Sequence, residues 1–235
     1  MNPVRRLAPV VAVAIALTGC GGGDNATVAM VPSSFTGLTD AIDAGLGTEA
    51  DWIIAGSSRL VRQLADGATA DLIVTADAKT MSDAIDQGLV AGDPIEIARN
   101  RLVLALAPGN PGGLGELADL ADADRLIGVC AVEVPCGRLA ARAVVELGLE
   151  LSVDTEEPNV RSLALKISRG ELDAGLIYAT DASELGLATL SEEALGEFET
   201  EYLAASIRPE RSRIIDYLRS DAGRELLAQE GFLLP

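Results

Sequence analysis

Serines stand at two corners of the chain where a short apolar run gives way to a helical pattern. Ser33 and Ser34 follow residues 26–31, and Ser57 follows residues 51–56. A serine oxygen can accept an otherwise unpaired N–H of the first helical turn, so the simplest interpretation of the first pair is a helix N-cap. A serine hydroxyl can also donate a hydrogen bond, and a helix N-terminus favours negative charge. These corners are therefore candidates for binding an anion.

Three further corners carry hydrogen-bond donors. Cys136 and Val160 each stand near the start of a helical pattern, and Tyr178 ends a strand-like run. None of these positions has a formal charge, so an anion there would be held by neutral donors and helix dipoles alone. An anion that carries a proton would leave that proton unpaired, at a cost of about 1–3 kcal/mol. The donor set therefore favours a fully ionised dianion of the sulfate, molybdate or tungstate type.

Strand-like and helical patterns alternate along the chain after residue 25. The strand-like runs are 26–31, 51–56, 71–76, 99–113 and 173–179, and the helical patterns are 33–46, 57–67, 78–89, 136–149 and 159–172, with a helix and then a strand in 114–130 and two helices in 212–235. Alternation of this kind predicts an α/β fold with a largely parallel sheet. In such folds ligands bind at the carboxyl ends of the strands, where the donor-bearing corners fall.

Composition excludes several classes of function. The net charge of −18 supplies no basic surface for nucleic acid, and the lack of histidine removes a Ser-His-Asp triad and the usual zinc sites. A serine–lysine enzyme would need Lys79 or Lys166, which we expect on exposed helix faces. A thiol oxidoreductase would need two cysteines separated by two residues, whereas five separate Cys130 from Cys136. We therefore predict that the protein is not an enzyme, and a structural lipoprotein stays open as an alternative.

The N-terminus has the features of an export signal. Two arginines precede an apolar run from Leu7 to Leu17, which is shorter than the roughly 20 residues of a membrane-spanning helix. The run ends in Leu-Thr-Gly-Cys, which resembles the bacterial lipobox. We predict a signal peptide over residues 1–19, lipidation of Cys20 and a flexible tether over residues 20–25. The mature protein would be anchored at the outer face of the cell membrane or on its periplasmic side.

Two cysteines remain in the exported part of the chain. Cys130 and Cys136 flank the short segment CAVEVPC. Cysteines of exported proteins are usually paired, and closing so short a loop would stabilise the fold by roughly 2 kcal/mol. We predict a disulfide, and a pair of buried thiols is the alternative.

Several long segments carry a resemblance to a known family. They are SSFT, GSSRLVRQLADGATADLIVTAD, NRLVLALAPG, EVPCGRLAARAVVELG, NVRSLALKISRGELDAGLIYATDA and YLRSDAGRELLAQEGF. With them the chain resembles the molybdate-binding proteins of ABC uptake systems over nearly all of its mature length. The resemblance implies a two-lobe, type II periplasmic-binding-protein fold, each lobe a mostly parallel sheet flanked by helices. It implies one lobe from residues 26–104 plus 184–235 and a second from residues 105–183, with the ligand cleft between them.

The same resemblance implies a set of binding residues and partners. The oxyanion would be held by hydroxyl and backbone donors of Ser34 and Ser57, by the backbone N–H groups of Cys136 and Val160 and by the phenol of Tyr178, with no direct protein ligand to the metal. No cofactor is implied. The expected partners are a small oxyanion and the permease of an ABC transporter, and the protein is expected to be a monomer.

Two departures from the family pattern bear on the ligand. The position of Cys136 is often alanine in the family, which a donor acting through its backbone tolerates. Pro32 and Ser33 stand where small apolar residues are usual, which could alter the size of the cavity. The choice between molybdate and tungstate therefore stays open, and sulfate or another tetrahedral oxyanion is the alternative ligand.

Overall fold

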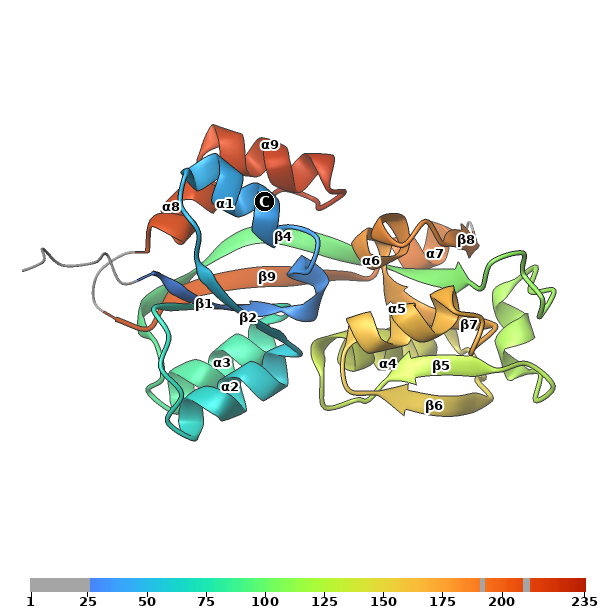
Figure 1. Ribbon diagram of the computed structural model, residues 1–235. Coiled ribbons are helices and arrows are strands. Elements are labelled where there is room, and N and C mark those ends of the chain that lie inside the picture. The colour runs from blue at the N-terminus through green and yellow to red at the C-terminus, as the bar shows by residue number, and fades with distance from the viewer. Residues whose placement is uncertain (1–25, 191–192, 209–211) are drawn as a thin grey trace, which may run out of the picture.

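The computed structural model describes residues 26–190, 193–208 and 212–235 (Figure 1). The elements, in chain order, are β1 (Val28–Pro32), η1 (Ser33–Phe35), α1 (Thr39–Leu46), β2 (Asp51–Ala55), α2 (Ser57–Ala65), β3 (Leu72–Thr75), α3 (Ala78–Asp86), β4 (Ala91–Leu106), η2 (Leu117–Ala121), β5 (Ile127–Cys130), α4 (Pro135–Leu147), β6 (Val153–Glu157), α5 (Val160–Ser168), β7 (Ala174–Tyr178), α6 (Ala179–Glu184), β8 (Ala188–Leu190), α7 (Glu193–Gly196), β9 (Glu199–Ser206), α8 (Arg213–Arg219) and α9 (Asp221–Gln229). The predicted signal peptide, tether and lipidated Cys20 lie outside the described residues.

The strands form two groups that share one long strand. In the first group β1 pairs in parallel with β2 and β3, and β9 pairs antiparallel with β3 and with the first part of β4. In the second group β5 pairs in parallel with β6 and β7, while β7 and β8 pair antiparallel with the last part of β4. We call these groups, with the helices packed on them, the first lobe and the second lobe (Figure 1).

The mixed α/β class and the two-lobe form are as predicted, but the sheet also has antiparallel members. The chain enters the second lobe along β4 and returns to the first along β9, and these two strands run in opposite directions side by side. Strand β9 was not predicted. The division of the lobes at residues 104/105 and 183/184 stays a prediction, and β8 pairs with Leu104–Leu106 in the second lobe.

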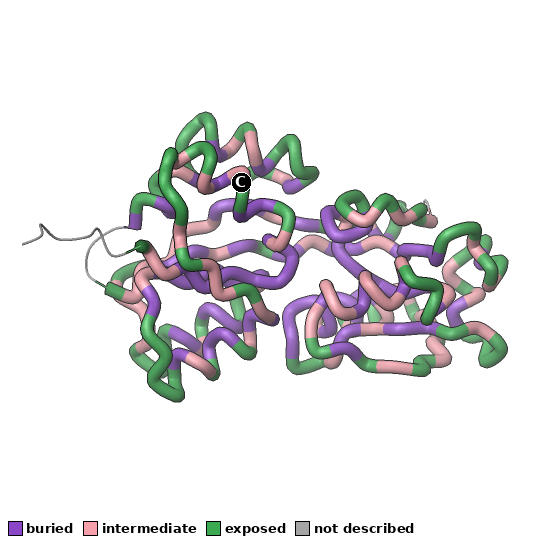
Figure 2. Tube along the Cα trace, viewed as in Figure 1, coloured by how far each residue is buried: buried purple, intermediate pink, exposed green. Residues whose placement is uncertain are grey.

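Strand alternation sorts the core of the first lobe onto two faces. On β1, Met30 packs beneath α2 and α3, whereas its neighbours Ala29 and Val31 belong to the cluster on the other face. On β9, Ala205 joins Met30, and Tyr202 joins Val31. Side chains of a strand point to opposite faces in turn, so this order is the expected one. Figure 2 shows the inner strands β1, β3 and β7 mostly buried and the outer sides of the helices exposed.

Two predicted helices are shorter than their patterns indicated. Residues 33–46 form a single 3₁₀ turn over Ser33–Phe35 and then α1, because Gly37 disfavours a continuous helix. Residues 114–130 contain only the 3₁₀ turn η2 before β5. Within the described residues, no helix combines the length and the apolar character that a membrane crossing requires.

Candidate functional site

A small cavity lies between the two lobes, at the carboxyl ends of β1, β3 and β7. The space in it that is open to the centre of a water-sized probe is about 10 Å³, which is roughly what one water molecule needs, so only a small solute fits there. The lining residues are Pro32, Ser33, Ser34, Gly56, Ser57 and Ala76 of the first lobe and Val134, Pro135, Cys136, Asn159, Val160 and Tyr178 of the second. All five residues predicted to bind the ligand are among them, and none of the lining residues carries a formal charge.

Three α-helices begin at this cavity. Helix α2 starts at Ser57, α4 at Pro135 and α5 at Val160. The α5 cap is a side chain, since Asn159 Oδ1 accepts the N–H of Ser162 at 2.9 Å. The first N–H groups of each helix have no partner within their own helix, and each N-terminus is the positive end of a helix dipole. The cavity therefore collects positive potential without a lysine or an arginine.

Ser57 has one hydrogen-bonding role inside the first lobe. Its Oγ accepts the backbone N–H of Ala76 at 3.0 Å, and the residue is only 2% exposed. The hydroxyl proton is not used in that bond, because a hydroxyl is both an acceptor and a single donor. Ser57 can therefore donate its proton into the cavity that it lines.

The predicted helix cap at Ser33 and Ser34 is wrong. Pro32 is the N-cap of the 3₁₀ turn that begins here, and no side chain caps it. The Oγ of Ser34 lies 2.7 Å from the phenol oxygen of Tyr202, which is 168 residues away in the chain. A contact at such separation competes with local capping, and it holds the Ser34 side chain at the cavity wall.

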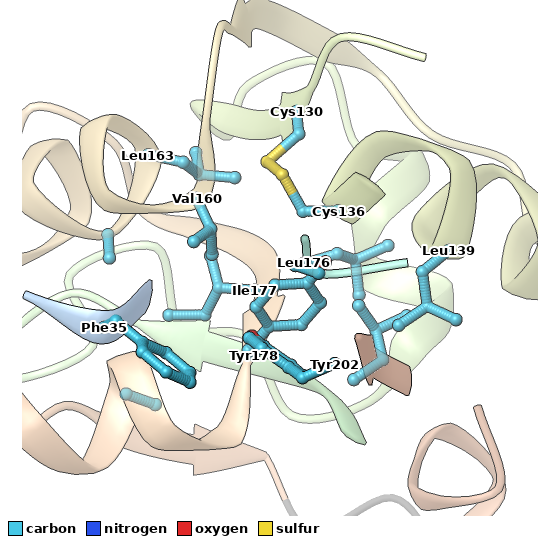
Figure 3. Packing of buried hydrophobic residues seen from close by; sticks show 14 of the residues in the cluster. Phe35, Cys130, Cys136, Leu139, Val160, Leu163, Leu176, Ile177, Tyr178 and Tyr202 are labelled. Carbon is cyan, nitrogen blue, oxygen red and sulfur yellow. A yellow bond between two sulfur atoms is a disulfide. The ribbon is translucent and has the colours of Figure 1, made fainter. Parts of the chain in front are cut away.

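Tyr178 brings a buried phenol to the cavity from the end of β7. The residue is 1% exposed, and its hydroxyl has no hydrogen-bond partner among the residues that the structure describes. Burial raises the pKa of the Tyr178 phenol well above its ordinary value, so the group stays protonated and can donate. Figure 3 shows this ring beside Tyr202, with Val160 and Cys136 on neighbouring segments. A buried donor without a partner is rare in folded proteins, and it indicates a place for an acceptor.

Cys136 is held rigidly at the second position of α4. It forms a disulfide with Cys130, the pairing that the sequence predicted (Figure 3). The next residue, Gly137, packs so closely that a Cβ there would lie 1.9 Å from the carbonyl oxygen of Ala131. Both features fix the start of α4 against the loop after β5. The backbone N–H of Cys136 is thereby positioned independently of its side chain.

Contacts between the lobes surround the cavity. Ser58 of the first lobe donates to the carbonyl oxygen of Glu133 in the second at 2.8 Å. Arg138 in α4 donates through Nε to Asp77 at 2.7 Å and through a terminal nitrogen to Thr80 at 2.7 Å, both in the first lobe. The two lobes therefore meet at the rim of the cavity.

A buried carboxyl group lies in α6, which begins directly after the lining residue Tyr178. Asp181 in the first turn of α6 is 1% exposed, and neither of its carboxylate oxygens has a hydrogen-bond partner within the described part of the chain. Burial raises the pKa of Asp181 from 3.8 to about 7, an effect that the charge of Arg161 opposes and that of Glu184 increases. A carboxyl group with this pKa is partly neutral near pH 7, which limits its repulsion of an anion.

The sequence patterns did not single out Tyr202, Asn100 or Asp181. Asn100 Nδ2 donates to Thr180 Oγ1 at 2.7 Å and lies 3.4 Å from the Tyr202 oxygen, behind the wall that carries Ser34. The one feature of the sequence that pointed to these residues was Asn100, a polar residue within an apolar run. The two lysines considered for catalysis bond to carboxylates, Lys79 to Asp83 and Lys166 to Glu157, and neither is a lining residue.

Two α/β lobes joined by β4 and β9, with a small cavity between them, define a protein of the solute-binding class. The sequence matches the family model described as bacterial extracellular solute-binding protein over residues 34–233. The chain belongs to this family.

Individual relatives and one solved structure are similar to the chain over most of its length. The chain is 34% identical to the molybdate-binding protein ModA of Mycobacterium tuberculosis over 217 residues, which cover 88% of this chain and 82% of the relative. It is 24% identical to the putative ABC transporter substrate-binding lipoprotein YvgL of Bacillus subtilis, over 75% of this chain and 72% of the relative. The structure of the periplasmic molybdate-binding protein of Azotobacter vinelandii superposes with a TM-score of 0.71 at 16% identity, over 89% of this chain and 99% of that one, a similarity of fold.

Proposed function

We propose that this protein binds molybdate or tungstate outside the cytoplasmic membrane and delivers the anion to the permease of an ABC transporter. The observation that carries the proposal is a small cavity lined by neutral donors from both lobes, one of them the buried phenol of Tyr178, which has no hydrogen-bond partner among the described residues. The relative that is 34% identical over most of the chain is a molybdate-binding protein, which supports this ligand.

Each donor in the proposal has a separate structural origin. Ser34, Ser57 and Tyr178 would supply hydroxyl groups, and Cys136 and Val160 would supply backbone N–H groups from the first turns of α4 and α5. All five bonds would reach anion oxygens, and no protein atom would ligate the metal. Hydrogen bonds to a charged group are worth about 1.5–3 kcal/mol each, so a few of them suffice for tight binding of a small dianion.

The same donor set supports binding rather than catalysis. The lining residues include no carboxylate, lysine or histidine that could act as an acid or a base. The single polar side chain of the lining that is not a hydroxyl, Asn159, already caps α5. We therefore infer a carrier without a cofactor.

Thermal unfolding of the purified protein in molybdate, tungstate, sulfate and phosphate tests the proposal. A ligand at a thousand times its dissociation constant adds about 4 kcal/mol to the free energy of unfolding, which corresponds to a rise in Tm of roughly 8–16 °C for a chain of this size. We expect that rise with molybdate and tungstate. A rise with sulfate alone would assign the alternative ligand, and no rise with any of the four anions would refute oxyanion binding.

Ligand capture in this proposal closes the lobes. Support comes from the even share of lining residues between the lobes and from the Arg138–Asp77 contact across the rim. Small-angle scattering should show a smaller radius of gyration with molybdate than without it, and a mass consistent with a monomer. An unchanged radius on saturation would contradict closure.

Anchoring through Cys20 is the last part of the proposal. The similarity to a lipoprotein of Bacillus subtilis supports it, together with the lipobox-like run before Cys20. The Cys20→Ser variant should leave the membrane fraction of the producing cells, because it lacks the thiol that receives the lipid. A variant that stays fully membrane-bound would contradict lipid anchoring.

A further inference from the structure

Behind the cavity wall, Tyr202 touches one of the proposed ligand donors. It lies on β9 with no exposed surface, and its phenol oxygen is 2.7 Å from Ser34 Oγ. The ring is fixed by other aromatic rings, stacked on Phe35 at 5.5 Å and edge-on to Phe232 at 5.2 Å between centroids. The direction of the Ser34–Tyr202 hydrogen bond decides where the Ser34 proton points.

Asn100 determines that direction. Its Oδ1 accepts the backbone N–H of Arg101 at 3.0 Å, which fixes the side-chain amide so that Nδ2 faces the other way. Nδ2 then donates to Thr180 Oγ1 at 2.7 Å and towards the Tyr202 oxygen at 3.4 Å. An amide nitrogen cannot accept a hydrogen bond, so the Tyr202 proton does not go to Asn100.

Ser34 Oγ is the only acceptor within hydrogen-bonding distance of the Tyr202 hydroxyl among the described residues. The Tyr202 phenol is buried, and burial raises its pKa further above the ordinary value, so it keeps its proton. Tyr202 therefore donates to Ser34, and the Ser34 proton is left to point into the cavity that Ser34 lines.

We propose that Asn100 and Tyr202 form a one-way chain of hydrogen bonds that makes Ser34 a donor to the ligand and hinders it from accepting. Tyr202 is thus a positioning residue for specificity. An oxyanion without protons gains the Ser34 bond, whereas one that carries a proton, such as hydrogen phosphate, meets a second proton there. The inference rests on the proposed oxyanion function and adds the two residues, Asn100 and Tyr202, that enforce the preference for unprotonated anions at Ser34.

The Tyr202→Phe variant tests this chain, because phenylalanine keeps the aromatic packing and removes only the hydroxyl. Calorimetric titration with molybdate, sulfate and phosphate should show the Kd for molybdate rising about tenfold, the size of one hydrogen bond. Sulfate and phosphate are both tetrahedral, so their affinity ratio reports on the proton. That ratio should fall at least about fivefold, because a released Ser34 hydroxyl can rotate and accept.

Matched variants separate this role from a structural one. Tyr217→Phe removes a hydroxyl from α8, away from the lining residues, and should change neither Kd nor the ratio. In a Ser34→Ala background, Tyr202→Phe should change the Kd less than twofold. If Tyr202→Phe does not fold, Asn100→Ala should lower the sulfate-to-phosphate ratio in the same direction.

Each result bears on one claim. Equal weakening of all three anions, or an undiminished effect in the Ser34→Ala background, would show a structural role for Tyr202 and overturn the inference. An unchanged molybdate Kd in Tyr202→Phe would overturn it as well. Failure of the unaltered protein to bind any oxyanion would instead refute the proposed function, so the two failures are distinguishable.

Discussion

Replacing Tyr178 by phenylalanine should separate binding from stability more cleanly than any other change in the cavity. The side chain is 1% exposed, and its hydroxyl has no hydrogen-bond partner among the described residues. The hydroxyl therefore contributes no bond to the ligand-free fold that its removal could break. The Tyr178→Phe variant keeps the ring, whose edge packs against Tyr202 at 6.3 Å between centroids.

The expected changes in Kd and in stability follow from the lack of a bond between this hydroxyl and the rest of the described fold. A hydrogen bond to a charged acceptor is worth about 1.5–3 kcal/mol, so the Kd for molybdate should rise roughly 10- to 150-fold. A buried polar group without a partner destabilises the fold, so the ligand-free variant should be equally stable or more stable, by up to about 1 kcal/mol. That gain corresponds to a rise in Tm of about 2–4 °C.

Calorimetric titration for affinity and thermal unfolding without ligand measure the two effects on the same preparations. Tyr217→Phe, on α8 outside the lining, serves as the matched control and should leave the affinity unchanged. An unchanged molybdate affinity in Tyr178→Phe would remove this phenol from the site. A large loss of Tm in the ligand-free variant would show that the hydroxyl supports the fold and would refute the reasoning.

Four other substitutions give distinct outcomes. Ser34→Ala and Ser57→Ala should each weaken molybdate binding by about 1–3 kcal/mol in calorimetric titration, and unchanged affinity would exclude a donor role. Cys136→Ala should change the affinity far less, because the donor there is the backbone, but it should lower stability by roughly 2 kcal/mol in urea unfolding through loss of the bond to Cys130. The pKa of the Asp181 carboxyl is raised on folding from 3.8 to about 7, so the folded state favours the protonated group. Its contribution to the free energy of unfolding is fully present below about pH 4 and is lost as the pH rises through about 7, a decrease of about 4 kcal/mol at most. Asp181→Asn should flatten that slope in urea unfolding measured across this range, and an unchanged slope would contradict the assignment.

The sequence was sufficient to predict those helix starts that are determined by the residues at the start itself. Asn159 caps α5 through its own side chain, and Pro135 at the first position of α4 has the fixed φ that suits a helix start. Tyr178 ends β7 because the apolar run stops there and α6 begins. The five candidate binding residues were found this way, together with a family resemblance, and they line one cavity.

Long-range contacts account for what the sequence patterns missed. Ser34 bonds to Tyr202, 168 residues away, so its local environment suggested a cap that does not form. The register of β9 on β4, which places Tyr202 opposite Ala98, has no local signature, and β9 was not predicted. Burial of Asp181 likewise depends on how α6 packs against β4, β7 and α5, and an isolated acidic residue gives no sign of that.

The protein has a net charge of −18, which would repel a dianion. Binding of a dianion therefore requires that the electrostatic potential at the site differ from that of the protein surface. Asp77, next to the lining residue Ala76, bonds to Arg138, and Glu184 pairs with Arg161 at 2.9 Å. Burial raises the pKa of Asp181 to about 7, so that carboxyl group is partly neutral near pH 7. More distant carboxylates are screened beyond about 10 Å at ordinary ionic strength. The helix N-termini, by contrast, are part of the cavity wall and act at contact distance. Local dipoles therefore outweigh the surface charge where the ligand would sit, and a donor set without lysine or arginine is compatible with an acidic carrier.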